Sequence, residues 1–550
     1  MNSTINTTFA KLSETLLSPT HYQRSLIRPI LSTIVLCLVV YQLIKYFTSD
    51  LPPFGSGLKR LPGPISTVPY LGRIHDVDRM HAWDSMKKFS DQYDGLFSCT
   101  LGGETHIWVA REDIAQDLLC KNAAISSARG DLGAYPGVTQ DRKYLPLLGY
   151  TKHLIRQKKF AHAMVTRNVD RKYYGHISLE AKRFLHEILM RPEDFFDLIP
   201  LFCARVSARL AYGDAQSAPE HVRNAGTFIS QLGPSGPITN LVPLLRFLPE
   251  LLVPDIRTVR LRQEAEERLW RRCFTEAENT MKEGQHETYT NASLRTKAGG
   301  NGENLLFEDK DEAMYAVGML CTVSIFTIGG PAVLFVLAMV LHPEWQRKIR
   351  EEIDIVVSEE MVDLKHSPQL PTLRAAILEA IRWRTTVPLG VPRLLEKNYT
   401  FDGYHFPKDA VVHVLDIALS RDPERYLNPS EYNPGRWLDE KSPNYKTPLT
   451  EYPRLKGHHI FGRGRRMCPG QDLAEAELFV LCGNLLKFFD LRPKLDRKGN
   501  PIWPDPDRWG TDVIGGPLPF ECNIEIRDEG KRICVERAYF GTFGDKIQSM

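Results

Sequence analysis

The sequence has little net charge and no block of like charges. Lys and Arg total 70 against 67 acidic residues, which gives a formal net charge of +3 over 550 residues. Basic and aromatic residues do not alternate anywhere along the chain, so we expect no nucleic-acid partner. A G-x-G-x-x-G unit is also missing, so the chain is not expected to hold a dinucleotide-binding or flavin module of its own.

The cysteines form no framework. A disulfide-stapled domain is short and dense in cysteine, and this chain has only ten cysteines and no C-x-x-C pair. We therefore expect reduced, mostly buried thiols in a protein that faces the cytosol. Cys468 is the exception, because its neighbours are unusual. The ten lie at Cys37, Cys99, Cys120, Cys203, Cys273, Cys321, Cys468, Cys482, Cys522 and Cys534.

The amino-terminal region carries an uncharged apolar run from Ile30 to Ile44, which extends past Lys45 to Phe47. A full membrane span needs ~20 apolar residues, so this run is slightly short. No small-residue cleavage site follows it, which favours a retained signal-anchor helix over a signal peptide or a buried core helix. Basic residues flank the run on both sides, so charge does not fix its orientation: Arg24 and Arg28 before it, Lys45, Lys59 and Arg60 after it.

Behind this run, the chain is predicted to form one large domain. Domain-size statistics allow two to four domains, but a bulky central cofactor can keep a chain of this size compact. Pro and Gly are dense between Leu51 and Pro64, which predicts a semi-rigid hinge. We therefore divide the chain into an amino-terminal segment (1–29), a transmembrane anchor (30–47), a hinge (48–64) and a globular domain (65–550).

Helical patterns dominate this domain, so its fold class is expected to be mainly α with a smaller β part. The run from Ala313 to Leu341 is almost wholly apolar, and we interpret it as a helix through the centre of the domain rather than a second membrane span. Residues 263–282 predict an amphipathic surface helix, and the polar stretch 284–305 an exposed or disordered loop. Strands are predicted near Leu96–Val109, Tyr399–Phe406 and Val411–Leu415.

The segment around Cys468 is the most specific motif in the chain. It fits the pattern F-x-x-G-x-R-x-C-x-G with Phe461, Gly464, Arg466, Cys468 and Gly470. A thiolate that binds haem iron must be anionic and shielded, and glycines allow backbone N–H groups to approach it. Phe461 can cover the sulfur, and Arg466 offers a forked donor for a haem propionate. A solvated basic turn, a phosphate loop and a metal site at His458 and His459 are alternatives, but none has the accompanying residues.

This loop resembles the haem-binding signature of the cytochrome P-450 superfamily, and three other segments fit the same resemblance. It implies that Glu379, Arg382 and Arg436 form a buried charge network that fixes the fold near the haem. It also implies that Arg393 supplies a cation to a propionate. Lys158 replaces the family's usual arginine; we weigh a role as a second propionate partner against a solvated basic face.

The central helix departs from the family pattern for oxygen activation. The resemblance places Thr327 at the first threonine, but Phe326 stands where the family has an acid that helps to deliver protons, and Ile328 replaces the second hydroxyl. Gly329-Gly330-Pro331 follows and is expected to bend or loosen the helix. Thr327 either serves oxygen activation or simply bonds a helix carbonyl, and the degraded motif leaves room for a register shift of one.

The resemblance implies a haem-thiolate monooxygenase that uses haem b, molecular oxygen and electrons from NADPH. Its expected partners are a separate NADPH–cytochrome P-450 reductase, cytochrome b5, a membrane and a small hydrophobic or aromatic substrate. The chain resembles fungal members of the family that act in secondary metabolism. We expect its catalytic domain on the cytosolic face of the endoplasmic reticulum and residues 1–29 in the lumen. Two alternatives stay open: a haem-thiolate enzyme that inserts no oxygen (a ring-coupling oxidase, isomerase or dehydratase), and a non-catalytic haem-binding membrane protein.

Overall fold

The computed structural model describes residue 33 and residues 51–165, 174–280, 288–294 and 306–547. Nearly all of the predicted anchor (30–47) lies outside these residues. Helices hold far more of the described chain than strands do, as the sequence predicts. They are α3 (Ala82–Gln92), α4 (Glu112–Gln116), α5 (Lys152–Val165), α6 (Tyr174–Met190), α7 (Phe195–Tyr212), α8 (Ala218–Ser230), α9 (Pro254–Asn279), α10 (Tyr289–Leu294), α11 (Lys310–Leu341), α12 (Pro343–Val356), α13 (Pro371–Trp383), α14 (Asp416–Ser420), α15 (Gln471–Phe488) and α16 (Glu529–Ile547).

The strands form three small sheets. The largest has the order β2-β3-β7-β4, with β2 antiparallel to β3, β3 parallel to β7 and β7 antiparallel to β4. The other two have the orders β1-β6-β5 and β10-β8-β9. The strands are β1 (Lys59–Arg60), β2 (Leu96–Leu101), β3 (Glu104–Val109), β4 (Arg393–Leu394), β5 (Tyr399–Phe401), β6 (Tyr404–Phe406), β7 (Val411–Val414), β8 (Phe489–Leu495), β9 (Pro501–Ile502) and β10 (Cys522–Ile526). All three predicted β regions are therefore confirmed.

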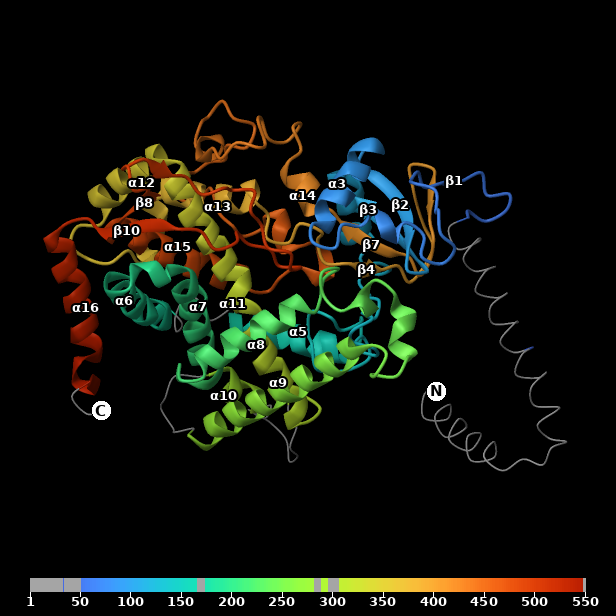
Figure 1. The fold of residues 1–550 in the computed structure, drawn as a ribbon, viewed down its shortest axis with the longest axis horizontal. Helices are drawn as coiled ribbons and strands as arrows, with labels where there is room; N and C mark the ends of the chain where they lie inside the picture. Colours follow the sequence, from blue (N-terminus) through green and yellow to red (C-terminus); the bar gives the residue numbers. More distant parts are fainter. Residues whose placement is uncertain (1–32, 34–50, 166–173, 281–287, 295–305, 548–550) are drawn as a thin grey trace.

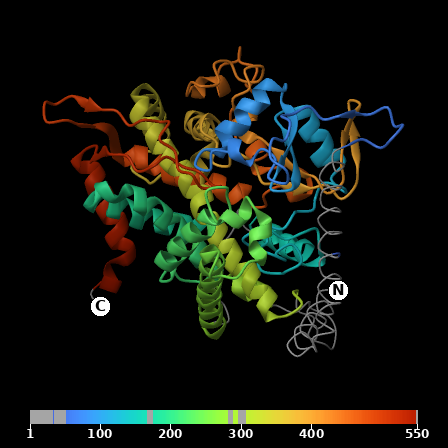
Figure 2. The same cartoon turned by 45° about the vertical axis from the view of Figure 1, so that its right-hand side comes forward.

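Helix α11 runs through the centre of the molecule, with the largest sheet to one side of it and α12, α13 and α15 to the other (Figures 1 and 2). It begins where the Asp309 carboxylate accepts a hydrogen bond from the Glu312 amide at 2.8 Å. Among the described residues it is the one helix long and apolar enough to cross a membrane, yet most of its side chains are buried in the core. The prediction of a central core helix is confirmed.

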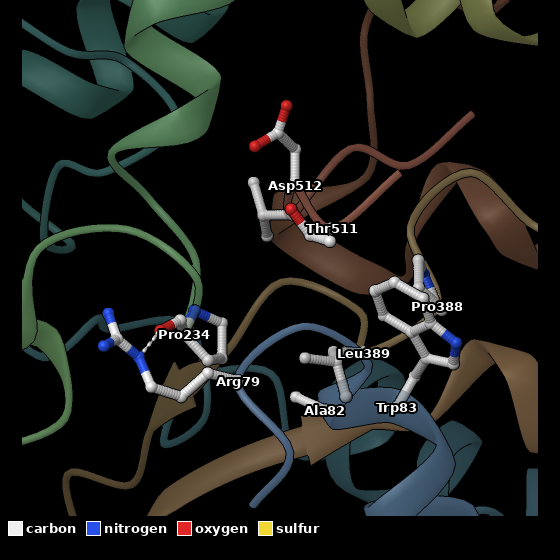
Figure 3. Close-up of a pocket in the computed structure, with 9 residues that line it drawn as sticks. Arg79, Ala82, Trp83, Pro234, Pro388, Leu389, Thr511 and Asp512 are labelled. Atoms are coloured by element: carbon white, nitrogen blue, oxygen red, sulfur yellow. Dashed lines mark hydrogen bonds between the residues drawn. The ribbon is translucent and has the colours of Figure 1, made fainter. Parts of the chain in front are cut away.

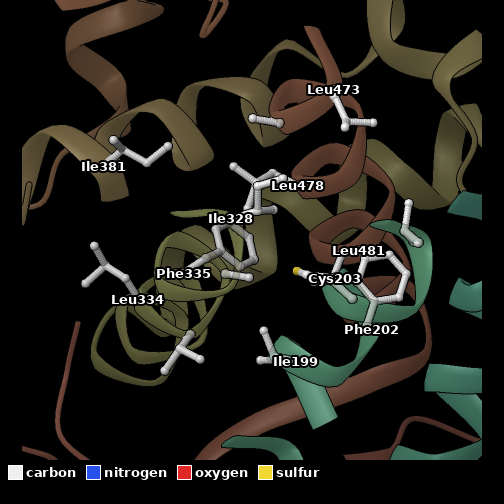
Figure 4. Packing of buried hydrophobic residues seen from close by; sticks show 14 of the residues in the cluster. Ile199, Phe202, Cys203, Ile328, Leu334, Phe335, Ile381, Leu473, Leu478 and Leu481 are labelled. Atoms are coloured by element: carbon white, nitrogen blue, oxygen red, sulfur yellow. The ribbon is translucent and has the colours of Figure 1, made fainter. Parts of the chain in front are cut away.

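The core is built where α7, α11, α13 and α15 meet. Figure 4 shows Ile328 and Phe335 of α11 facing Phe202 and Cys203 of α7, with Leu478 of α15 closing the cluster. Each of these side chains is nearly inaccessible to water. Burial of such side chains stabilises a fold by about 1.5–3 kcal/mol each, so this cluster holds α11 firmly in the middle of the domain.

Two predicted boundaries need correction. Lys59 and Arg60 pair with β6 and Leu61 is buried, so the last residues of the predicted hinge already belong to the folded domain. Within the predicted loop 284–305, residues 289–294 form the short helix α10. Its polar side chains are buried because their hydroxyls find backbone acceptors: Thr290 Oγ1 donates to the Ala211 carbonyl at 2.8 Å.

Candidate active site

The loop that carries Cys468 is closed by its own backbone. The Cys468 amide donates to the Phe461 carbonyl at 2.8 Å, and the Gly470 amide lies 3.3 Å from Cys468 Sγ. Helix α15 begins at Gln471, so its positive N-terminal end lies beside the sulfur. Burial raises the pKa of the Cys468 thiol, whereas the Gly470 amide and the Lys158 ammonium lower it. The loop therefore holds a shielded sulfur surrounded by groups that stabilise an anion.

Gly464 and Gly470, the two glycines of the motif around Cys468, have different roles in the loop. Gly464 has a φ of +58°, and a Cβ atom there would lie 1.8 Å from the Leu119 carbonyl oxygen. At Gly470 a Cβ atom would lie 3.6 Å from Cys468 Sγ, an ordinary contact. The Gly470 amide does approach the sulfur, but a Cβ atom would be tolerated there, so this approach does not require a glycine; Gly464, in contrast, lets the loop pack against the turn at Asp117–Lys121.

Four cations gather near the cysteine loop: Arg129, Lys158, Arg393 and Arg466. Burial lowers the pKa of Lys158 to about 8 and that of Arg393 to about 9, and in both cases the neighbouring Arg466 lowers the pKa further. Burial also lowers the pKa of Arg466 to about 10. We call these four residues the cation cluster. The predicted residues Lys158, Arg393 and Arg466 are thus brought together.

Backbone carbonyls are the only partners of the cation cluster within the described chain. Arg393 Nη2 donates to the Arg463 carbonyl at 3.2 Å, and Arg466 Nε to the Ser127 carbonyl at 2.8 Å. Lys158 Nζ, which is partly exposed, donates to the Arg465 carbonyl. Arg393 Nη1 and Arg129 Nε are buried without any partner.

Cations that are partly or fully buried without a carboxylate are costly, because their charge is less hydrated than in water and is not neutralised. The arrangement therefore fits an anionic group that is bound between these side chains. A haem group, with two propionate carboxylates at one edge and an iron that binds a thiolate, matches both the cation cluster and Cys468.

Arg129 escaped the sequence analysis because it lies in no motif. It is placed by a β-bridge between its neighbour Ala128 and Leu394, in which the Leu394 amide donates to the Ala128 carbonyl at 3.0 Å. Leu394 directly follows Arg393, so the bridge puts the two arginines close together. Only the pairing of two segments that are far apart in sequence reveals this residue.

The predicted charge network is formed and is fully buried. Arg382 donates to both oxygens of Glu379, at 2.7 and 2.9 Å, and Arg436 Nε donates to Glu379 Oε1 at 2.9 Å. Trp437 Nε1, which the sequence analysis missed, donates to Glu379 Oε2 at 3.0 Å. Arg382 also bonds the carbonyls of Ser420, Pro429 and Glu431, so the network ties α13 to the segment before the cysteine loop.

Thr327 lies on an exposed part of α11, and its Oγ1 donates to the Val323 carbonyl at 2.7 Å. Pro331 lies inside α11, which continues without interruption to Leu341. Proline has no N–H, so the carbonyl of Thr327, four residues earlier, lacks its normal helical donor. Phe326 packs against α8, where a Cβ atom on Gly226 would lie 3.7 Å from its ring. The position of the family's acid is thus filled by apolar packing.

A buried polar cluster connects the loop 122–151 to α8 and α9. The Tyr144 hydroxyl donates to Glu266 Oε2 at 2.6 Å and accepts from Arg262 Nη2 at 2.9 Å. Arg262 and Glu266 of α9 form an ion pair at 3.0 Å, and Asn224 of α8 donates to Glu266 Oε1 at 2.9 Å. We call these four residues the clasp, because they join three segments that are otherwise far apart in the sequence.

Comparison with known proteins gives a consistent result. A family model described as Cytochrome P-450 matches residues 62–510. The cytochrome P-450 monooxygenase virE of Hypocrea virens is 28% identical over 88% of this chain and 88% of its own length. The monooxygenase fogE of Aspergillus ruber is 27% identical over 86% of this chain and 87% of its own.

The fold comparison agrees. A solved zebra fish cytochrome P-450, described as a structure with abiraterone, has a TM-score of 0.65 and 18% identity, and the match covers 81% of this chain and all of that one. At this identity the likeness speaks for the fold alone. The family match spans most of the chain, and the fungal relatives are named monooxygenases. The chain belongs to the cytochrome P-450 family and is a cytochrome P-450 monooxygenase.

Proposed function

We propose that this chain is a haem-thiolate monooxygenase in which the Cys468 thiolate would bind the iron of haem b. The cation cluster carries this proposal, because one buried and three partly buried cations without a carboxylate lie beside the cysteine of an anion-stabilising loop. Arg129, Lys158, Arg393 and Arg466 would hold the propionates. The network of Glu379, Arg382 and Arg436 keeps the loop in place and has a structural role.

When bound, haem iron supplies the redox chemistry that activates molecular oxygen, and a thiolate ligand promotes it. Cys468 holds the negative charge for this purpose, and the Gly470 amide and the N-terminal end of α15 keep that charge stable. Phe461 fixes the loop through its carbonyl. Gly464 allows the close contact of the loop with Leu119.

In helix α11, we assign proton delivery to Thr327, which has no acid as its neighbour in the sequence. The hydroxyl oxygen, whose hydrogen is donated to Val323, and the Thr327 carbonyl, which Pro331 leaves without a helical donor, together offer a water molecule two acceptors. A water held there can pass protons, although less effectively than a carboxylic acid. We also propose that helix α11 is bent or loosened at Gly329-Gly330-Pro331.

We infer a small hydrophobic or aromatic substrate in fungal secondary metabolism, in keeping with the relatives virE and psoD, the latter 27% identical over 86% of this chain and 92% of its own length. The apolar packing of Phe326 favours an easily oxidised substrate such as a phenol or indole. A second candidate function follows from the same preference for an easily oxidised ring: coupling of two rings without oxygen insertion, in which the hydrogens removed from the rings leave in water. Isomerase or dehydratase activity and a non-catalytic role have no observation in their favour.

Electrons are proposed to come from NADPH through a separate reductase, with cytochrome b5 as a second donor. Of the two arginines that flank Gly464 in the cysteine loop, Arg463 is buried, and its Nη2 lies 2.6 Å from Glu112. Arg465 stays exposed, close to the exposed apolar side chains of Tyr150 and Met467. A docking face for an acidic partner would therefore use Arg465 with Lys159 of α5.

We propose a location at the endoplasmic reticulum membrane, with residues 1–29 in the lumen, the anchor at 30–47 and the catalytic domain (65–550) in the cytosol. An exposed apolar surface between α8 and α9 supports contact with a membrane. Phe247, Leu251 and Leu252 are 72%, 90% and 66% exposed. Burying such a surface in lipid would add to the hold of a single anchor.

A carbon monoxide difference spectrum tests the haem-thiolate proposal. The purified full-length protein should give the thiolate type of spectrum, and Cys468→Ser should lose it. A protein without haem, or a spectrum unchanged in Cys468→Ser, would contradict the proposal. Turnover with labelled oxygen then separates the two candidate functions: insertion adds one labelled atom to the product, and coupling adds none.

A further inference from the structure

The loop from Trp509 to Pro517 lies against the face of α11 that carries Thr327. A Cβ atom on Gly330, one turn after Thr327, would lie 3.6 Å from Thr386 Cγ2 and 3.7 Å from the Gly515 carbonyl oxygen. The Gly515 amide donates to the Thr386 carbonyl at 2.7 Å. On its other side the loop is tied to the segment after α8, where Ser235 Oγ donates to the Thr511 carbonyl at 2.8 Å. The loop is therefore fixed at both ends beside the face of α11 that carries Thr327.

Asp512 is the one acid in this fixed part of the loop, 511–516, and it has no hydrogen-bond or ion-pair partner among the described residues. It is half-buried, and burial raises the pKa of its carboxyl without an opposing contribution from any cation. The side chains around it are largely apolar, with Trp83, Leu389 and Val513 lining the same pocket (Figure 3). A carboxylate in such surroundings costs free energy unless a partner neutralises it.

The nearest cation in the pocket is already engaged. Arg79 Nε donates to the Pro234 carbonyl at 3.1 Å, and its Nη2 donates to the Gly236 carbonyl at 2.7 Å. Figure 3 shows the Asp512 carboxylate pointing away from both Arg79 and Trp83. Arg79 is therefore not available to neutralise Asp512, whose carboxylate is left to water or to a bound ligand.

We propose that Asp512 selects the substrate by forming an ion pair with a protonated amine that the substrate carries. This inference rests on the proposed function and names the substrate class: an apolar or aromatic molecule with a basic nitrogen. An amine fits better than a hydroxyl group, because a half-buried carboxylate gains most from a partner that also neutralises its charge. The loop positions the carboxylate rigidly, so the pair would also orient the ring towards α11.

The test compares three ligands on the full-length holoenzyme by titration calorimetry. They are gramine, an indole whose tertiary amine is protonated at neutral pH; its isostere, in which a carbon replaces that nitrogen; and the anion indoleacetate. Wild-type protein should bind gramine about tenfold more tightly than the isostere, a difference of about 1.4 kcal/mol. Asp512→Asn should bring the ratio of the two dissociation constants close to one and leave the isostere's affinity unchanged.

Glu525→Gln is the matched control, because Glu525 is an exposed acid on the neighbouring strand β10 with no partner among the described side chains. It should keep the wild-type ratio. A wild-type ratio near one, an absence of gramine binding, or an equal ratio in wild type and Asp512→Asn would overturn the proposal. The carbon monoxide spectrum of the same preparations separates this outcome from a failure of the haem-thiolate proposal, since Asp512→Asn should leave that spectrum intact.

Discussion

The hydroxyl group of Tyr144 donates a 2.6 Å hydrogen bond to Glu266 and so joins the loop 122–151 to helix α9. Burial and the nearby carboxylate of Glu266 raise the pKa of Tyr144, so the hydroxyl stays a donor across the physiological range. We expect Tyr144→Phe to leave the clasp one donor short and to lower the free energy of unfolding by about 1–3 kcal/mol. The loop and α9 should then separate more often, which would speed the entry of bulky ligands.

Stopped-flow binding of a bulky azole and of carbon monoxide distinguishes a gating effect from a general loss of stability. Tyr144→Phe should raise the association rate of the azole severalfold and leave that of carbon monoxide unchanged. Glu264→Gln is the control, because Glu264 lies on the same helix but is exposed and pairs only with Arg260 among the described residues. Equal azole rates in Tyr144→Phe and wild type would show that the clasp does not limit access.

The contact between Gly464 and Leu119 makes the cysteine loop intolerant of a side chain. We expect Gly464→Ala to yield little haem-containing protein, because the Cβ atom would overlap the Leu119 carbonyl and the φ of +58° adds strain. Gly457→Ala is a matched control: its φ is +84°, but nothing lies within 4 Å of the added atom. It should cost only about 1 kcal/mol. The haem content of the two purified variants is the measurement, and similar values would refute the steric argument.

Local patterns predicted those parts of the fold and the site that depend on nearby residues. The spacing around Cys468, the helical face shared by Glu379 and Arg382 and the apolar run of α11 each sit within one segment, and each appears in the structure as expected. Trp437 was missed because nothing in its own segment shows that its indole N–H would meet Glu379.

Features that depend on contacts between two segments far apart in the sequence could not be predicted from the sequence. Arg129 meets the cation cluster through the pairing of Ala128 with Leu394, and Arg463 turns inward because Glu112, far earlier in the chain, neutralises it. The polar composition of residues 284–305 predicted an exposed or disordered loop. In α10, however, hydroxyl side chains such as that of Thr290 are buried and donate hydrogen bonds to backbone carbonyls. In each case a tertiary contact decides whether a polar side chain lies inside or outside.

Asp416 gives the domain a pH dependence that can be measured. Burial raises the pKa of its carboxyl from 3.8 to about 7, and it lies 3.3 Å from Nδ1 of His459, whose own pKa burial lowers to about 3. Both groups are therefore neutral in the folded protein between about pH 3 and about pH 7. Because the folded state holds this proton more tightly than the unfolded state, the contribution to stability is full below about pH 4 and is lost as the pH rises towards 7.

Thermal unfolding at a series of pH values checks this sign. Between pH 4 and 7 the wild-type protein should lose stability relative to Asp416→Asn, whose amide cannot ionise, and above pH 7 the difference between the two should become constant. Glu525→Gln, which changes an exposed acid, should follow the wild-type curve. A difference between wild type and Asp416→Asn that does not vary with pH would mean that Asp416 is ionised throughout.

Pro331 offers the sharpest test of how this enzyme handles protons without an acid next to Thr327. Pro331→Ala restores an N–H that can donate to the Thr327 carbonyl, so α11 should gain stability, by up to about 3 kcal/mol, while the water position beside Thr327 is lost. Thr327→Val removes the hydroxyl and keeps the carbonyl free. If both groups hold the same water, each variant should slow the peroxide-driven oxidation of guaiacol at least about tenfold, and the double variant should be no slower than the worse of the two. The carbon monoxide spectrum should stay the same in all three variants, because none of them touches the cysteine loop.

A Pro331→Ala enzyme that is more stable and as fast as wild type would assign proton delivery to the hydroxyl alone and leave the proline a purely structural role.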